Sequence, residues 1–200
     1  MKSRKRNRRG GVTTIEVLTA SALSVVATFT AVAVMISGMS SWAKGQGRIM
    51  AESDAQNAVR AISNELREAM AVTVLSGTAI EYRLPQKDND GNFVVPALWD
   101  GVTRRIEWQS TDGGMGLVRI TGGSTNNVVC KNVILRDPQS SGFTPTTGGS
   151  TYSIFTAGAG TVTRQLTIMI ATRANAAKKE YVVSRSRETV FLRNIPTLTR

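Results

Sequence analysis

Histidine is absent from this 200-residue chain, and Cys130 is its only cysteine. A single cysteine excludes an internal disulfide, and together the two shortages remove the usual ligands of a zinc centre. A catalytic triad built on histidine is excluded as well. We therefore expect a protein that is not an enzyme, with no catalytic residues, no bound metal and no cofactor.

Acidic residues are missing from the first 11 positions, which carry six basic side chains: Lys2, Arg4, Lys5, Arg6, Arg8 and Arg9. The formal net charge of +11 would by itself suggest nucleic acid or an anionic membrane as a partner. Because six of these charges lie in one short segment, the rest of the chain is only mildly basic. We do not expect nucleic acid as a partner.

Charge of either sign is absent from residues 17–43, a run of 27 mostly apolar residues. A helix of that length reaches about 40 Å, whereas the hydrocarbon core of a bilayer is about 30 Å thick. The basic residues before the run hold the N-terminus in the cytoplasm by the positive-inside rule. We predict one membrane span, with everything after Lys44 on the opposite side.

Three interpretations of this segment compete. A plain signal anchor explains the basic flank and the apolar run without processing. A secretory signal peptide would be cut near Ala31-Val32-Ala33, but its apolar region is usually only about 7 to 15 residues long. Neither explains Glu16, because a carboxylate costs up to about 2.5 to 3.5 kcal/mol at the bilayer centre and normally marks a function or a partner.

The third interpretation starts from the position of Glu16, five residues after Gly11, in the segment Arg8-Arg9-Gly10-Gly11-Val12-Thr13-Thr14-Ile15-Glu16-Val17. This segment resembles the N-terminal signal of type IV prepilins and type II secretion pseudopilins. The shared features are a basic leader, a glycine, a short apolar stretch and a glutamate at the fifth mature position. Val12 and Thr14 depart from the residues commonest in the family, which are phenylalanine and leucine.

The resemblance implies that a prepilin peptidase cuts after Gly11 and methylates the new amino group of Val12. Cleavage would create an ammonium group near the apolar layer, and the carboxylate of Glu16 is a suitable partner for it. In the family this pair is thought to join neighbouring subunits, so that Glu16 sets the register of filament assembly. The alternative is that Glu16 extends to the lipid headgroups without a partner.

Partners and location follow from the same resemblance. It implies the prepilin peptidase, other pilins or pseudopilins of a filament, and inner-membrane lipid as partners. The protein would reside in the bacterial inner membrane, with a cytoplasmic N-terminus and a periplasmic C-terminal domain, and then join a pilus or pseudopilus.

Four segments are predicted along the chain. Residues 1–11 form a leader that is removed, 12–43 the transmembrane part of an N-terminal helix, 44–71 its amphipathic continuation, and 72–200 a β-rich globular domain. Gly45 and Gly47 predict a bend or hinge, because glycine costs about 1 kcal/mol relative to alanine inside a helix. The apolar face of the continuation is predicted to comprise Ala55, Val59, Ile62, Leu66 and either Ala69 or Met70.

Beyond residue 72 the apolar pattern has a period of two, which predicts strands. We expect strands containing Ile80, Tyr82 and Leu84, then Ile106 and Trp108, then Leu117 and Ile120, with a turn at 111–114. Further strands are expected near 128–135, 153–155, 166–171 and 181–192, with a loop over 139–151. The expected fold is α+β and type IV pilin-like, with one long helix packed on an antiparallel sheet.

The helix sequence at 58–67 and the last predicted strand also look like those of W-type minor pilins and J-type minor pseudopilins. This resemblance implies a minor filament subunit. Two alternatives remain open: a signal-anchored periplasmic binding domain and a DNA-binding competence pilin. The second would use basic residues near the C-terminus, namely Arg164, Arg173, Lys178, Lys179, Arg185, Arg187 and Arg193, which otherwise form a solvated strand face.

The segment Asp88-Asn89-Asp90-Gly91 suggests a calcium loop. In that frame Gln86 would occupy the first ligand position and Ala97 the position of the bidentate glutamate. We therefore interpret it as an ordinary turn.

Overall fold

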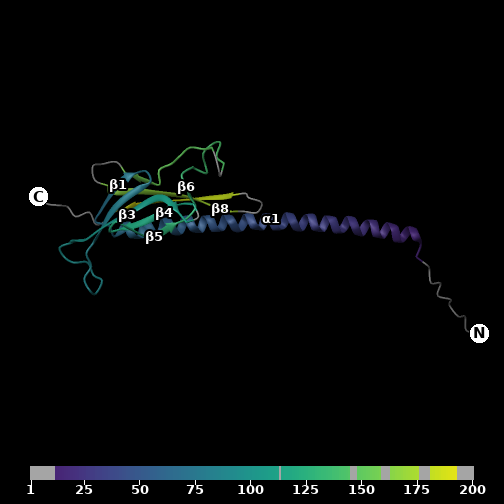
Figure 1. The fold of residues 1–200 in the computed structure, drawn as a ribbon, viewed down its shortest axis with the longest axis horizontal. Helices are drawn as coiled ribbons and strands as arrows, with labels where there is room; N and C mark the ends of the chain where they lie inside the picture. Colours follow the sequence, from purple (N-terminus) through teal and green to yellow (C-terminus); the bar gives the residue numbers. More distant parts are fainter. Residues whose placement is uncertain (1–11, 113, 145–147, 159–162, 176–180, 193–200) are drawn as a thin grey trace, which may run out of the picture. The chain divides into compact units, whose positions relative to one another are not determined.

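The computed structural model describes residues 12–112, 114–144, 148–158, 163–175 and 181–192. The chain forms two units, Met1–Ala43 and Lys44–Arg200. The helix α1 (Thr14–Arg67) contributes to both, and Figure 1 shows it as one uninterrupted helix. The strands that follow are β1 (Ala71–Ser76), β2 (Ala79–Pro85), β3 (Trp99–Thr111), β4 (Gly114–Thr121), β5 (Ser124–Cys130), β6 (Val133–Ile134), β7 (Phe155–Ala157), β8 (Gln165–Asn175) and β9 (Tyr181–Phe191).

In the first unit, the described residues from Thr14 onward form the apolar part of α1. Large apolar side chains are exposed throughout it, among them Leu23, Phe29 and Trp42. By length and composition α1 is able to cross a membrane. The prediction of a long apolar N-terminal helix is therefore confirmed.

The second unit is built around the last part of α1. Six apolar residues of the helix are buried at spacings of one to four positions: Ala51, Ala55, Ala58, Val59, Ile62 and Leu66. They form one stripe on the helix, as the sequence predicts. Ala69, just beyond the end of α1, is also buried. Of the two residues predicted as alternatives, Ala69 and not Met70 therefore completes the apolar face.

The strands form two antiparallel sheets. The first is a meander in the order β1-β2-β3-β4-β5, and in the second β8 pairs with β6, β7 and β9. Buried residues of α1 and of both sheets share one core, which includes Ile62, Tyr82, Ile106, Phe155 and Ile168. A helix packed on antiparallel sheet, and hence the α+β class, is confirmed.

One expectation about local structure is wrong. Residues 128–135 are not one strand, because β5 ends at Cys130 and β6 starts at Val133, in different sheets. Asn132 lies between them with φ of 55°, a left-handed conformation that asparagine tolerates better than most residues.

The helix α1 continues without interruption through Gly45 and Gly47, where the sequence predicts a bend or hinge. Gly47 is buried instead, and a Cβ atom there would lie 3.2 Å from the backbone oxygen of Asn175 in β8. This glycine therefore allows the helix to approach a strand closely.

Candidate processing and assembly segment

The residues predicted to be processed lie immediately before α1. Gly11 is outside the described residues, so cleavage after it stays a prediction. Val12 is the first described residue and is 74% exposed. Thr13 separates it from the start of α1 at Thr14.

Glu16 takes part in a reciprocal pair of hydrogen bonds with Thr13. The backbone N–H of Thr13 donates to Oε2 of Glu16 at 2.8 Å, and the backbone N–H of Glu16 donates to Oγ1 of Thr13 at 3.3 Å. This is a capping box, in which two side chains satisfy two backbone donors that the first helical turn leaves without partners. The acidic side chain also lies at the positive end of the helix dipole.

The capping box is a role that sequence reasoning missed. Its signal is present in the spacing Thr13-Thr14-Ile15-Glu16, since threonine followed three residues later by glutamate is the sequence signature of this cap. Glu16 therefore has a local structural task before any partner is considered.

Most hydroxyl groups in the apolar part of α1 are satisfied within the helix. Six of them donate to backbone carbonyl oxygens three or four residues earlier, at 2.8 to 3.1 Å: those of Thr19, Ser21, Ser24, Thr28, Thr30 and Ser40. An apolar surrounding penalises a hydroxyl that has no hydrogen bond. This segment can therefore face lipid or another helix without unpaired hydroxyls at these six positions.

The last part of α1 is held to the first sheet by polar contacts around Glu65. The hydroxyl of Tyr82 in β2 donates to Oε1 of Glu65 at 2.5 Å, and Nη2 of Arg119 in β4 donates to Oε2 at 2.5 Å. Burial, followed by the hydrogen bond to Glu65, raises the pKa of Tyr82 above its ordinary value. These contacts fix the helix against two strands that are far away in sequence.

The second sheet is attached to the helix in the same way. The hydroxyl of Thr172 in β8 donates to the backbone oxygen of Ala51 at 2.6 Å, in a buried position. Arg67, the last residue of α1, pairs with Glu188 in β9 at 2.8 Å. Both sheets are therefore attached to one helix by specific polar contacts as well as by packing in the shared core.

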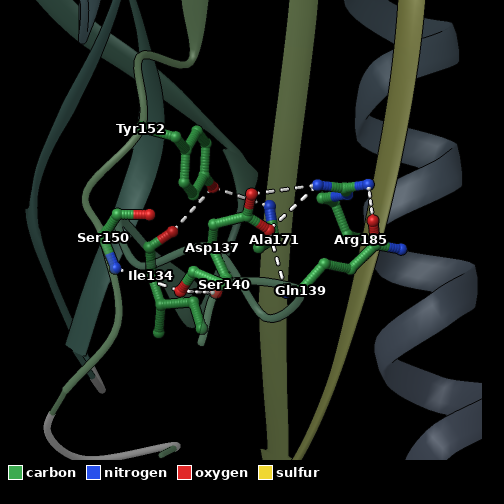
Figure 2. A network of polar contacts seen from close by, with 8 residues as sticks. All are labelled: Ile134, Asp137, Gln139, Ser140, Ser150, Tyr152, Ala171 and Arg185. Atoms are coloured by element: carbon green, nitrogen blue, oxygen red, sulfur yellow. Dashed lines mark hydrogen bonds and ion pairs between the residues drawn. The ribbon is translucent and has the colours of Figure 1, made fainter. Parts of the chain in front are cut away.

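A third polar network joins the loop after β6 to β8 and β9, and Figure 2 shows it from close by. Nη1 of Arg185 binds both carboxylate oxygens of Asp137, at 2.9 and 3.1 Å. The hydroxyl of Tyr152 donates to the backbone oxygen of Ile134 at 2.7 Å and accepts from the backbone N–H of Ala171 at 2.8 Å. The network positions the loop over the sheet.

This network bears on the basic residues near the C-terminus. The register pairs Ala171 with Arg185 and Met169 with Arg187, which places Arg173, Arg185 and Arg187 on one face of β8 and β9. Asp137 neutralises Arg185 there. Arg164 is exposed, and Lys178, Lys179 and Arg193 lie outside the described residues.

The segment at 88–91 is a turn. Oδ1 of Asp88 accepts hydrogen bonds from the backbone N–H groups of Asp90 and Asn92, at 3.0 and 2.8 Å. Gly91 has φ of 83°, which glycine adopts readily. Within the described residues no group of three or more histidine, cysteine, aspartate or glutamate side chains is arranged to hold a metal ion.

Comparison with known proteins adds no relative. No family model matches the chain, and neither the curated proteins nor the solved structures contain a significant match.

Proposed function

We propose that this chain is a membrane-anchored structural subunit of a filament in the bacterial cell envelope. The observation that carries the proposal is that the two parts of α1 are suited to different surroundings. One continuous helix supplies an exposed apolar segment and, further on, the buried stripe of a β-rich domain. An assembly subunit needs both parts, because the first can be stored in a membrane and packed against other helices, while the second presents a folded domain.

Within that class, we propose a minor pilin or pseudopilin of a type IV pilus or type II secretion system. The support is the motif from Arg8 to Val17 combined with a helix that begins three residues after Gly11. On this proposal the prepilin peptidase removes residues 1–11, methylates Val12, and leaves the domain in the periplasm until assembly.

Glu16 then has two successive roles. Before cleavage its carboxylate caps α1 through the N–H of Thr13. After cleavage the new ammonium of Val12 lies within about 4 Å of that N–H, because consecutive backbone nitrogens are joined through only two atoms. The same carboxylate is therefore within reach of the Val12 ammonium of its own chain. During assembly, the Val12 ammonium of a neighbouring subunit competes for this carboxylate.

The proposal is tested by the mass of the mature N-terminus in a cell that makes the peptidase. We expect a chain that begins at Val12 and carries one methyl group on its amino nitrogen. A chain that begins near Val34 would indicate signal peptidase, and an intact chain would indicate a plain signal anchor. Either result would contradict the proposal.

A pair of variants makes this test specific. Gly11→Val should abolish cleavage and leave membrane insertion unchanged, because the basic flank and apolar run that drive insertion remain. Gly10→Val is the matched control, with the same change one residue away from the proposed cut, and it should still be processed. Cleavage of the Gly11→Val chain at the same bond would show that the peptidase assignment is wrong.

A further inference from the structure

A cavity of about 320 Å³ lies where the two sheets meet. Its walls include Trp108 from β3, Met115 from β4 and Arg173 from β8, together with Leu135 and Arg136 just after β6. This volume is at the lower end of the range for small-molecule sites. The cavity is unrelated to the segment around Gly11 and has no part in the proposed processing.

The charge of this cavity is unusual for the domain. Six of the described arginines are half-buried, and four of them pair with carboxylates at 2.5 to 3.0 Å: Arg104 with Asp100, Arg105 with Glu107, Arg119 with Glu65 and Arg185 with Asp137. The other two are Arg136 and Arg173. Neither pairs with a carboxylate in the described part of the chain, and both line this cavity. Partial burial of a charge is costly when it has no counter-charge, so the pair favours an anion.

Both guanidinium groups are oriented by contacts that leave most of their donors available. Nη1 of Arg136 donates to the backbone oxygen of Gly148 at 2.8 Å, and the guanidinium of Arg173 lies 5.1 Å from the ring centre of Tyr181. An arginine has five N–H donors, and a contact with a ring face uses none of them in a hydrogen bond. The remaining donors suit a carboxylate, which arginine binds through two parallel hydrogen bonds.

The rest of the wall is apolar and anchored. Nε1 of Trp108 donates to the backbone oxygen of Val133 at 3.2 Å, which fixes the indole ring. Trp108 and Leu135 both pack against the hydrophobic core, so this wall is backed by rigid structure. A small hydrated anion would leave the apolar wall unused, whereas a ligand with an apolar body would cover it.

We propose that this cavity binds a carboxylate attached to an apolar body. Two sources have that chemistry: the C-terminus of a polypeptide that ends in an apolar residue, and a free carboxylic acid of similar size. Arg136 and Arg173 bind the carboxylate, and Trp108, Met115 and Leu135 contact the apolar body. Asn132, which also lines the cavity, is available to a backbone amide if the ligand is a polypeptide end.

The test uses the full chain in mild detergent and isothermal titration calorimetry with four probes. N-acetyl-L-phenylalanine should bind with a dissociation constant on the order of 1 mM, the value that typical binding per atom gives for so small a ligand. N-acetyl-L-phenylalaninamide, with the same body and no charge, should bind at least about tenfold more weakly, since it loses charge-assisted hydrogen bonds. Acetate tests the anion without a body, and it should also bind at least about tenfold more weakly.

The fourth probe, 3-phenylpropanoate, separates the two sources. It has the carboxylate and the ring but lacks the amide. Weaker binding than N-acetyl-L-phenylalanine would support a polypeptide end, and equal or tighter binding would support a free acid. Equal binding of the amide and the acid to the unaltered chain would overturn the proposal, and so would equal binding of acetate and the acid.

Variants give an independent check. Arg136→Gln and Arg173→Gln should each weaken binding of N-acetyl-L-phenylalanine about tenfold. Arg187→Gln is the matched control, because Arg187 is an exposed arginine of the same sheet that does not line this cavity, and its affinity should be unchanged. If both cavity variants bind like the control, the cavity is not the site. The comparison of probes on the unaltered chain remains decisive even if a variant folds poorly.

Discussion

The two parts of α1 differ in where their polar groups find hydrogen-bond partners and in whether their apolar side chains are buried. In residues 14–43 six hydroxyl groups bond to the helix's own backbone, and the large apolar side chains are exposed. In residues 44–67 the apolar stripe is buried, and Glu65 finds its partners in β2 and β4. The first part is therefore suited to any apolar surrounding, whereas the second is specific to one domain. A single helix can join a membrane to a folded domain because its own backbone hydrogen bonds are satisfied in both surroundings.

The largest expected effect comes from truncating one buried residue of the second part. Ile62 is completely buried, and Ile62→Ala should lower the free energy of unfolding of the domain by about 2 to 5 kcal/mol, through lost burial and the cavity it leaves. Leu23→Ala is the matched change in the first part, where the side chain is 70% exposed. It should change that free energy by no more than about 0.5 kcal/mol.

The measurement is denaturant unfolding in mild detergent, monitored by tryptophan fluorescence. Equal effects of Ile62→Ala and Leu23→Ala would contradict the conclusion that only the second part of α1 is packed into the domain.

A smaller effect is expected from alkaline pH. The pKa of Tyr82 is raised in the folded domain, so the folded state holds the phenolic proton more tightly than the unfolded chain does. The contribution of this proton binding to the free energy of unfolding is therefore complete below the unfolded pKa of about 10. It is lost as pH rises above that value, by up to about 1.4 kcal/mol per pH unit. Tyr82→Phe should make the free energy of unfolding less dependent on pH in this range.

Unfolding measured between pH 8 and pH 11 tests this, with the helicity of the apolar segment as the internal comparison. Residues 17–43 contain no tyrosine, cysteine or charged residue, so their helicity should not respond. An unchanged pH dependence in Tyr82→Phe would remove Tyr82 as its cause.

The smallest effect on domain stability is expected from Glu16, whose proposed role is in assembly. Glu16→Gln deletes the charge but keeps a residue that can complete the capping box. Thr13→Ala keeps the charge but removes the hydroxyl half of the cap. Neither should alter unfolding of the domain. Glu16→Gln should reduce incorporation of the processed protein into sheared or cross-linked filaments, and Thr13→Ala should reduce it much less.

This pair separates the two roles of Glu16. Normal incorporation of Glu16→Gln would exclude a role for its charge in assembly. Equal loss in both variants would show that the charge of Glu16 is not the specific requirement, because Thr13→Ala keeps that charge.

Local patterns predicted much of this structure. The stripe at Ala55, Val59, Ile62 and Leu66 and the alternation at Ile80 and Tyr82 are repeats of the helix and strand periods, so they are readable without knowing the partner surfaces. The capping box is equally readable, because threonine and glutamate stand three residues apart at Thr13 and Glu16. The break at Asn132 is not, because the apolar residues on either side of it serve two different sheets.

Sequence by itself determined where the apolar helix lies and how it begins, because hydropathy, helix capping and bonding of hydroxyls to the backbone act over only a few residues. Tertiary structure alone decided which charges far apart in the sequence pair with one another. Arg119 meets Glu65 across 54 positions of sequence and Arg185 meets Asp137 across 48, whereas Arg136 and Arg173 both line one cavity without a described acid as partner. Such pairings depend on which strands the fold makes neighbours, and no short-range pattern encodes that choice.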